Sequence, residues 1–227
     1  MLKAMRKEDL KKKYKDIKVY TIAKDLAKKE SAKEIYDELK EKNINVSILI
    51  NNAGFGCFGK LIDLDIEKND DLLMVNNYSL VNLAYYFGKD MAERKNGKIL
   101  NVASIAAFAG GPYMATYYAS KAFVLSFSEA LREELKKDNI TVTCLCPGPT
   151  RTNFEKAANL RKSYMFEKLK VTSAEFVARV GYNALMNGKS VVIAGVINKL
   201  IIFLSKLSPR KLNAKITSYI NLGKLKK

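Results

Sequence analysis

Short apolar runs alternate with amphipathic runs along most of the chain, and this alternation limits the possible folds more than any other feature. Near-continuous apolar character predicts buried strands at DIKVYTIA (16–23), NVSILI (45–50), GKILNVAS (97–104), ITVTCLC (140–146) and SVVIAG (190–195). Helical spacing of apolar residues predicts helices at about 28–42, 66–92, 116–137 and 173–187. Strands that alternate with helices predict a parallel sheet covered by helices on both faces.

The same patterning places the whole chain, residues 1–227, in a single domain, because its length suits one α/β unit. The stretch 148–172 matches neither a strand nor a continuous helix, and we expect it to form a lid over a substrate site. From 196 to 227, apolar residues recur at helical spacing among lysines. This pattern predicts an amphipathic C-terminal helical extension, with a second helix that opens at Pro209.

The chain contains no histidine, and this narrows the chemistry available to it. Ser-His-Asp catalysis, Cys-His catalysis and histidine-ligated metal sites are excluded, and we expect no metal. A general acid or base near neutral pH must therefore be a perturbed Tyr, Lys, Asp, Glu or Cys.

Three cysteines, Cys57, Cys144 and Cys146, lack the spacing of a zinc site. Cys144 and Cys146 fall on the same face of a predicted strand, and we expect all three to be buried, reduced thiols. The longest apolar run, 191–204, is interrupted by Asn198 and Lys199 and is too short to cross a bilayer. Because no signal peptide is recognisable, we expect a cytoplasmic protein.

The formal net charge is +17. Basic residues are spread among acidic ones, and neither an aromatic RNA-binding motif nor a recognition-helix pattern accompanies them. We therefore expect solvated helix faces and no nucleic-acid partner. The apolar face of 196–227, flanked by lysines, leaves two alternatives open: a weak peripheral membrane contact, or a helix that covers the core or a dimer interface.

A glycine-rich stretch, GFGCFG at 54–59, matches the G-x-G-x-x-G pattern directly after an apolar strand. A dinucleotide-binding fingerprint also needs a helix that starts at this turn. The following KLIDLDIEKND predicts no helix until about Ile66, so the match is weak. The preceding NNAG (51–54) is a better candidate, because asparagine carboxamides can bond neighbouring backbone while Ala and Gly let a flat ring approach.

The stretch ATYYASKAF at 115–123 places a lysine four residues after one tyrosine and three after the next. On a helix, Tyr117 and Tyr118 are both neighbours of Lys121, and geometry prefers Tyr117 only slightly. An ammonium beside a phenol favours the phenolate and lowers the phenol pKa from its usual value of about 10. Such a phenol can serve as acid or base, although this spacing alone is more often a surface pair.

Further polar residues follow the ends of predicted strands. Ser104 ends the strand at 97–104, NNAG follows the strand at 45–50, and PGPTRT (147–152) follows the strand at 140–146. The carboxyl ends of parallel strands open onto one crevice, where ligands bind. We therefore expect these residues to converge.

These motifs resemble those of the short-chain dehydrogenase/reductase family. The resemblance covers roughly residues 5–195 and rests on NNAG, Asn76, Ser104, Tyr117 with Lys121, and Pro147-Gly148 with Thr152, in the family's order and spacing. It implies a Rossmann-like three-layer α/β fold with a parallel sheet. It also implies an NAD(P)-dependent oxidoreductase that transfers hydride to or from a carbonyl or hydroxyl substrate.

The resemblance implies catalytic roles for four side chains. Tyr117 would exchange a proton with the substrate oxygen, Lys121 would lower the Tyr117 pKa and bond the nicotinamide ribose, and Ser104 would hold the substrate. Asn76 would anchor a water in a proton path, with a buried asparagine that satisfies backbone as the alternative. An apolar small-molecule substrate is expected from the lid residues Phe154, Tyr164, Met165 and Phe166.

Cofactor contacts are implied in the same way. Thr152 and the backbone of Pro147 and Gly148 would hold the nicotinamide end, next to Asn51, Ala53 and Gly54. Asp25 matches an adenine contact or, alternatively, caps a helix. Arg6 falls where members that prefer NADP carry basic residues, so we expect NADP rather than NAD, with a solvated charge as the alternative.

The family's first strand, glycine-rich turn and helix have no counterpart in this sequence. In the family's strand order, 3-2-1-4-5-6-7, the first strand separates the strands that match 16–23 and 45–50. We therefore expect an incomplete sheet in which these two segments either pair in a new arrangement or stay exposed.

Two expectations about activity and assembly follow from the resemblance. The family's members are usually dimers or tetramers, and we expect a homo-oligomer formed through the helices at 66–92 and 116–137. A catalytically impaired fragment or a non-catalytic binding protein is the alternative to an active enzyme.

Overall fold

The computed structural model describes residues 10, 14, 16–151 and 171–222 of the chain. Two predicted cofactor contacts, Arg6 and Thr152, lie outside the described residues, and so do the four aromatic and apolar lid residues named above.

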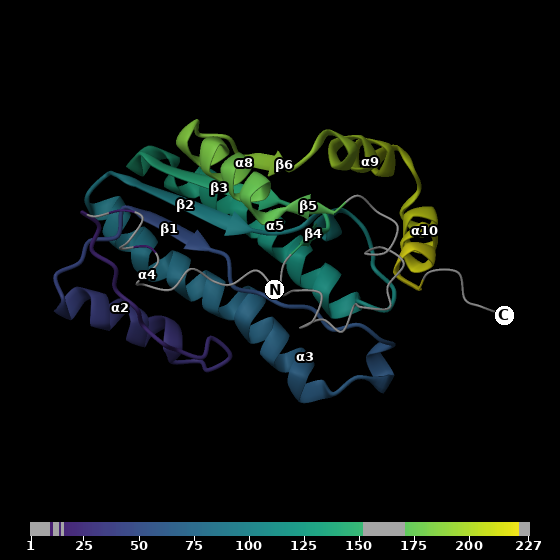
Figure 1. Ribbon diagram of the computed structural model, residues 1–227, viewed down its shortest axis with the longest axis horizontal. Helices are drawn as coiled ribbons and strands as arrows, with labels where there is room; N and C mark the ends of the chain where they lie inside the picture. Colours follow the sequence, from purple (N-terminus) through teal and green to yellow (C-terminus); the bar gives the residue numbers. More distant parts are fainter. Residues whose placement is uncertain (1–9, 11–13, 15, 152–170, 223–227) are drawn as a thin grey trace.

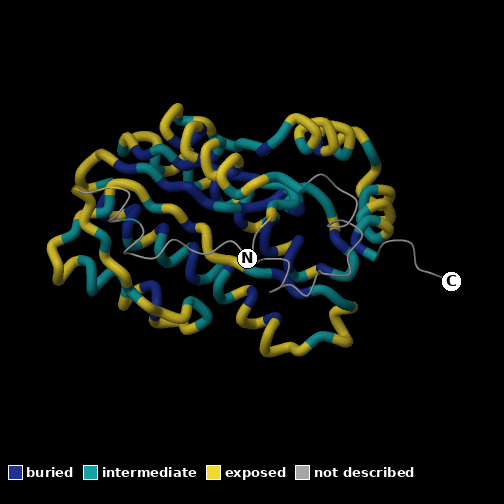
Figure 2. The backbone as a smooth tube through the Cα atoms, viewed as in Figure 1, coloured by how far each residue is buried: buried dark blue, intermediate teal, exposed yellow. Residues whose placement is uncertain are grey.

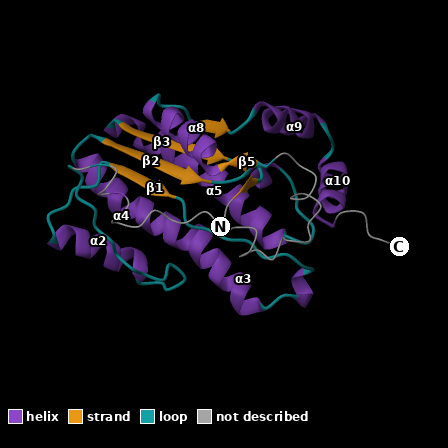
Figure 3. Ribbon diagram, in the orientation of Figure 1, coloured by secondary structure: helices purple, strands orange, loops and turns teal. Residues whose placement is uncertain are grey.

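A parallel sheet forms the centre of the fold (Figure 3). Its strands run in the order β1 (Ile48–Asn51), β2 (Gly97–Val102), β3 (Ile140–Cys146) and β6 (Val191–Ile193). Two short strands, β4 (Thr150–Arg151) and β5 (Thr172–Ser173), pair with each other in a second sheet. Four of the five predicted strands are thereby confirmed, together with their parallel arrangement.

The predicted helices are confirmed as well. They are α2 (Ser31–Glu41), α3 (Ile66–Leu73), α4 (Ser79–Glu93), α5 (Ala115–Leu135), α8 (Ala174–Met186), α9 (Val196–Leu207) and α10 (Arg210–Leu222). A π-helical turn, η2 (Met74–Tyr78), joins α3 to α4, so the predicted helix at 66–92 is continuous but irregular in its middle. Short 3₁₀ turns occur at η1 (Leu61–Asp63), η3 (Ile105–Phe108) and η4 (Lys136–Asp138).

The helices cover the sheet on both faces, as the alternating pattern predicts (Figure 1). Ile99 and Val142 pack in a cluster with side chains of α2, α4 and α5. Leu100 on β2 and Leu145 on β3 point to the opposite face and pack with side chains of α8. Successive strand residues thus bury their side chains in two different layers, which gives a Rossmann-like three-layer α/β domain.

The predicted strand at 16–23 is wrong. This segment has no regular secondary structure, and Tyr20 is 54% exposed. In the described part of the chain β1 pairs only with β2, and Ile50 on β1 is 53% exposed. A strand needs a neighbour for its backbone N–H and C=O groups, and no described strand lies between these two segments, which are both largely exposed (Figure 2).

The C-terminal extension folds into α9 and α10 beside the carboxyl end of the sheet (Figure 1). Asn221 near the end of α10 is buried and donates a hydrogen bond to the Pro112 carbonyl at 2.8 Å, which ties this helix to the loop before α5. Among the residues that the structure describes, no helix combines the length and apolar character needed to span a membrane.

Candidate active site

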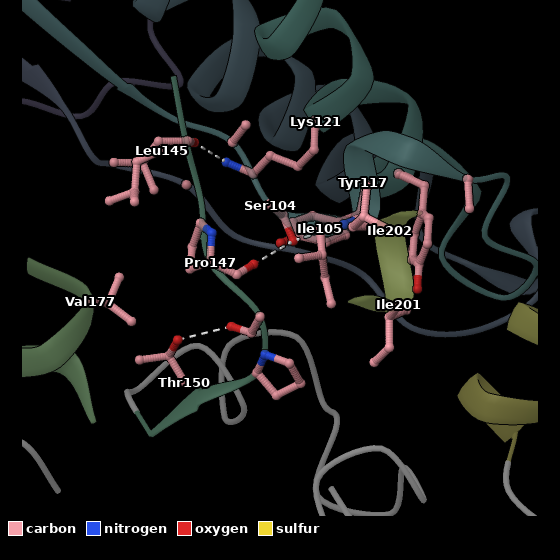
Figure 4. A pocket seen from close by; sticks show the side chains of 18 of the residues that line it. Ser104, Ile105, Tyr117, Lys121, Leu145, Pro147, Thr150, Val177, Ile201 and Ile202 are labelled. Atoms are coloured by element: carbon pink, nitrogen blue, oxygen red, sulfur yellow. Dashed lines mark hydrogen bonds between the residues drawn. The ribbon is translucent and has the colours of Figure 1, made fainter. Parts of the chain in front are cut away.

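A cavity of about 900 Å³ opens at the carboxyl ends of β1, β2 and β3. Strand ends, the first turns of α5 and the helices α8, α9 and α10 all contribute to its wall. The predicted site residues that line it are Gly54, Ser104, Tyr117, Lys121, Pro147 and Gly148. Figure 4 shows Lys121, Tyr117 and Val177 around this space, each from a different side.

Ser104 follows β2 and is held by backbone on both sides. Its Oγ accepts a hydrogen bond from the Ala106 N–H at 3.1 Å and donates one to the Pro147 carbonyl at 3.5 Å. The hydroxyl also interacts with the phenol of Tyr117 and favours its ionised form. The side chain is 9% exposed, so its orientation is fixed before any substrate arrives.

Tyr117 and Tyr118 are both buried at the start of α5, but they have different partners. Tyr117 interacts with Ser104 and lines the cavity. The Tyr118 hydroxyl donates to Asn221 Oδ1 at 3.3 Å, and Asn221 belongs to α10. Tyr118 therefore holds the C-terminal extension against α5, which leaves Tyr117 as the acid/base candidate.

Lys121 lies one helical turn after Tyr117 and is only 5% exposed. Its Nζ donates to the Val102 carbonyl at 2.9 Å and lies 5.9 Å from the centroid of the Tyr117 ring. Burial lowers the pKa of Lys121 to about 8, and the nearby thiols of Cys144 and Cys146 offset part of this effect.

The predicted lowering of the Tyr117 pKa is wrong for this arrangement. Burial raises the pKa of Tyr117 to about 12, and the hydrogen bond with Ser104 reverses only part of that rise. Desolvation penalises the phenolate more than the hydrogen bond favours it. At neutral pH the site therefore presents a protonated phenol, which is a proton donor.

Asn76 lies on the π-helical turn η2, and both polar atoms of its side chain are hydrogen-bonded to protein groups. Its Nδ2 donates to the Phe55 carbonyl and to Ser120 Oγ, both at 3.0 Å, and its Oδ1 accepts from the Phe55 N–H at 3.0 Å. These bonds match the structural alternative for this residue, whereas its place in a proton path stays a prediction.

Gly54 lies where backbone and side chains approach closely. A Cβ at this position would lie 2.8 Å from Asn76 Oδ1 and 3.3 Å from Lys121 Nζ. Only glycine therefore allows the loop after β1 to pass this near to Lys121.

The turn after β3 packs against α9, one of the two C-terminal helices. A Cβ on Gly148 would overlap the carboxamide of Asn198 on α9, so this glycine permits close contact. Thr150 lines the cavity and donates from Oγ1 to the Gly148 carbonyl at 2.9 Å. The sequence pattern singles out Thr152 and misses Thr150, although both hydroxyls belong to the same PGPTRT stretch.

Three predicted cofactor residues do not line the cavity: Asp25, Asn51 and Ala53. Asn51 is buried at the end of β1, where its Nδ2 donates to Asn101 Oδ1 at 2.9 Å. Asp25 accepts from the Ala27 N–H at 3.0 Å in an exposed turn, and Glu30 is the N-cap of α2, so the capping alternative is wrong. Asn52, which sequence reasoning did not choose, lines the cavity instead.

The glycine motif at 54–59 has a structural role in this fold. The first α-helix after it is α3, which begins at Ile66 as predicted. Phe55, Cys57 and Phe58 pack in the cluster that contains Tyr117 and Tyr118. The motif is therefore followed by no helix N-terminus that could bind phosphate, and the expectation of a weak match is confirmed.

The residues at the Lys121 end of the cavity fit the nicotinamide-ribose half of an NAD(P) cofactor. Among described residues, Lys121 has one hydrogen-bond partner, so two N–H groups of its ammonium remain for ribose hydroxyls. The backbone of residues 52–54 is exposed beside it, and the bare Gly54 leaves room for a flat ring. No glycine-rich turn that leads into a helix is found in the described part of the chain. The phosphate half of the cofactor therefore lacks a comparable set of contacts there.

Helices α9 and α10 supply a part of the wall that sequence reasoning missed. Their lining residues are Ile201, Ile202, Ser205, Asn213, Ile216, Thr217 and Ile220. The helical spacing of Asn213, Thr217 and Ile220 places them on one face, which could have indicated that α10 covers a site.

Comparison with known proteins gives one consistent result. A family model described as short chain dehydrogenase matches residues 2–163. The Helicobacter pylori protein named "Probable short-chain type dehydrogenase/reductase VdlC" is 31% identical over 184 residues, which cover 80% of this chain and 65% of that protein. The chain thus spans just under two thirds of the length of this curated relative.

Solved structures agree with the sequence comparison. A "bulky-bulky ketone specific alcohol dehydrogenase" from Comamonas testosteroni is 26% identical with a TM-score of 0.71, over 88% of this chain and 76% of that one. A short-chain dehydrogenase from Sphingobium yanoikuyae in complex with NADPH is 26% identical with a TM-score of 0.68, over 80% and 72% of the two chains.

Proposed function

Because this chain belongs to the short-chain dehydrogenase family, an oxidoreductase family, we propose that it reduces an apolar ketone with NADPH. The observation that carries the proposal is the convergence of Ser104, Tyr117 and Lys121 on one wall of the cavity. Each side chain is buried and oriented by protein contacts, and the other walls are largely apolar.

The protein's own residues would handle the proton and the substrate oxygen. The Ser104 oxygen, fixed by the Ala106 N–H, would turn its proton from the Pro147 carbonyl, 3.5 Å away, to the substrate carbonyl oxygen beside the Tyr117 phenol. Tyr117, whose pKa is raised to about 12, would donate its proton to that oxygen as a general acid. Lys121 would stabilise the resulting phenolate, since its ammonium lies over the same ring.

A bound nicotinamide would supply the hydride to the carbonyl carbon. Gly54, Lys121, Pro147 and Gly148 would hold its ribose end. The choice of NADP over NAD is supported by the NADPH that accompanies the Sphingobium structure, and by the family position of Arg6.

The apolar wall supports an apolar and bulky substrate. Val177 on α8, Met114 before α5 and Ile202 on α9 line the cavity and come from three separate elements. A carbonyl group would meet the hydroxyls of Ser104 and Tyr117, while the remaining substrate would displace water from apolar side chains. The name of the Comamonas enzyme, specific for bulky ketones, agrees with this substrate class.

Substitution of the two neighbouring tyrosines tests the proposal. The protein is assayed with NADPH and a panel of bulky ketones. Tyr117→Phe should lower kcat/KM by about 10²–10⁴-fold through loss of the proton donor. Tyr118→Phe is the matched control, since it removes only the bond to Asn221 and should retain activity within about tenfold. Equal losses in both variants would contradict the assignment.

The pH dependence should differ between the two directions. A phenol with a pKa raised to about 12 stays protonated in the neutral range, so ketone reduction should change little between about pH 6 and 7.5, where the Lys121 ammonium, with a pKa of about 8, also keeps its charge. Oxidation of the alcohol needs the phenolate, and its rate should rise by about tenfold per pH unit in the same range. Parallel profiles in the two directions would argue against Tyr117 as the titrating group.

A non-catalytic binding protein remains the second candidate, because the open edge of β1 favours it. Gly54, the proposed cofactor contact beside this edge, is exposed. Calorimetry separates the two candidates. An enzyme should bind NADPH with a Kd below about 1 mM, whereas no detectable heat at several millimolar cofactor would favour the binding protein.

We also propose association through α4 and α5, the helices expected to form an oligomer. Tyr85 on α4 is 62% exposed, and Phe123 on α5 is 46% exposed and stacks on Phe127. Apolar aromatic side chains of this kind are enriched at protein interfaces. Sedimentation of Phe123→Glu should show a shift toward monomer if this face is buried in the oligomer.

A further inference from the structure

The outward face of α9 is apolar, whereas a helix on a water-exposed surface normally carries polar residues there. Asn198, Ile202 and Ser205 form the inward face, of which Ile202 is buried. Successive residues of an α-helix are about 100° apart, so the opposite, outward face holds residues spaced three or four positions apart. Its members are Val196, Leu200, Phe203 and Leu207, which are 80%, 57%, 60% and 72% exposed.

The apolar face continues onto α10. Leu212, Ile216 and Tyr219 are 47%, 47% and 53% exposed. Both helices lie at the end of the molecule beyond the carboxyl edge of the sheet, and their outer turns are exposed in Figure 2. Exposed apolar residues at helical spacing on two consecutive helices indicate a surface that another body covers.

The charges around this face have one sign. No acidic residue occurs from Phe176 to Lys227, although the chain has 23 elsewhere. The two helices carry Lys199, Lys206, Arg210, Lys211 and Lys215. On α9 the two lysines lie at the side of the apolar face, not at its centre, and Lys206 Nζ lies 5.7 Å from the centroid of the Phe108 ring.

We propose that α9 and α10 form a docking surface for an anionic lipid bilayer, with the apolar face of α9 in the boundary between headgroups and acyl chains. Apolar side chains flanked by lysines are the pattern of helices that lie in a membrane interface. A second copy of this chain is a poorer occupant, because a two-fold contact would bring one set of these cations against the same set.

The cavity opens beside this docking surface. Ile201 on α9 and Ile216 on α10 both line the cavity, yet they are 43% and 47% exposed. Residues that line the cavity and are also exposed lie at the rim of its opening, so this rim would face the bilayer. An apolar substrate could then pass from the lipid to Ser104 and Tyr117, a step that rests on the proposed reductase function, whereas the docking itself does not.

A single fluorescent probe tests the docking. The chain contains no tryptophan, so Phe203→Trp introduces the only one, and Ile62→Trp is the matched control. Ile62 is 90% exposed and lies on η1, beside Asp63 and away from the cations of α9 and α10. The membranes are vesicles of phosphatidylcholine with or without phosphatidylglycerol at about three to one.

The expected result is specific to one position and one lipid. The tryptophan emission of Phe203→Trp should shift to the blue and be quenched by brominated acyl chains in anionic vesicles, and about 0.5 M salt should weaken the effect. The emission of Ile62→Trp should not respond. Equal responses in the two variants, or no response in Phe203→Trp, would overturn the proposal.

A binding measurement supplies the second arm. The double variant Leu200→Glu/Phe203→Glu changes two outward residues that do not line the cavity. It should lower partitioning onto anionic vesicles at least about tenfold, while Ile62→Glu should not. Circular dichroism establishes that both variants keep their helices.

The same variants identify the alternative occupant. If the double variant converts a dimer to a monomer without lipid and leaves vesicle binding unchanged, α9 contacts a second copy and the proposal is overturned. Neither measurement uses NADPH or a ketone, so an inactive protein that binds vesicles would count against the reductase function alone.

Discussion

The two ends of the carboxyl edge of the sheet are built differently. At the β2–β3 end, Ser104, Tyr117 and Lys121 are each at most 9% exposed and are bonded to backbone or to one another. At the β1 end, Asn52, Ala53 and Gly54 are exposed and the strand has a free edge within the described residues.

The difference shows that burial in this fold depends on whether a strand has neighbours on both sides, because β2 pairs with β1 and β3 whereas β1 pairs only with β2 within the described residues. The residues at the β2–β3 end are buried because β2, β3 and α5 supply their contacts. The β1 end would need a neighbour on its outer side to bury Ile48 and Ile50. Substitutions at matched positions in the two regions should therefore have very different effects.

The largest effect on stability is expected at Gly111, in the closed region. A Cβ at this position would overlap the ring of Tyr118, which is itself held by Asn221. Gly111→Ala should lower the free energy of unfolding by about 3 kcal/mol, because neither ring nor backbone can move away freely. Urea unfolding measures the change.

The adjacent glycine is the control. A Cβ on Gly110 would lie 3.8 Å from the Cβ of Ala214, an ordinary contact. Gly110→Ala should change the free energy of unfolding by less than about 1 kcal/mol. Similar losses at both glycines would contradict the overlap with the Tyr118 ring as the cause of the Gly111→Ala effect.

A smaller change in the free energy of unfolding is expected at Lys121, where a substitution should stabilise the fold instead of destabilising it. Burial lowers its pKa from 10.5 to about 8. Each pKa unit corresponds to about 1.4 kcal/mol, so the buried ammonium destabilises the fold by about 3 kcal/mol at pH 7. Lys121→Met removes that charge and one hydrogen bond, and should raise the free energy of unfolding by about 2 kcal/mol while activity is lost.

The pH dependence identifies the cause. Between about pH 8 and 10.5 the unfolded chain holds this proton and the folded chain does not, so stability from Lys121 rises with pH in that window. The pKa of Tyr117 is raised to about 12, so its contribution falls between about pH 10 and 12. Unfolding at about pH 7 and 9.5 should show the rise in the wild type but not in Lys121→Met.

The smallest expected change in unfolding free energy comes from making the same substitution in each of the two regions. Ile99 on β2 is fully buried, whereas Ile48 on β1 is 41% exposed. Ile99→Val should cost about 1 kcal/mol of unfolding free energy, and Ile48→Val close to zero. If Ile48→Val costs as much as Ile99→Val, then β1 is covered in solution and the free edge has a partner.

Most of the fold could be predicted from sequence because its patterns are local. The run ITVTCLC predicts β3 with its boundaries, and the geometry of parallel strand ends brings Ser104, Tyr117 and Lys121 together. The three cysteines are free and buried, as expected. Such predictions succeed where a residue's environment follows from its own segment and its place on the sheet.

The failures share a physical cause, since each depends on what a segment meets elsewhere. The run at 16–23 has the composition of a strand but pairs with no other segment in the described part of the chain. The pKa of Tyr117 depends on how completely η3, α3 and the loop at 55–64 exclude water, which the four-residue spacing to Lys121 does not reveal. Asp25 and Asn51 have side chains that bond to nearby protein groups, and their types alone could not distinguish this from ligand contact.

The bond between Tyr118 and Asn221 has a consequence for the order of folding. It spans 103 residues, so its partner is made long after α5 has left the ribosome. At roughly 5–20 residues per second, about 5–20 s separate the synthesis of the two side chains. During that interval the Tyr118 hydroxyl lacks its partner on α10, so the first turn of α5 gains this contact only late in synthesis.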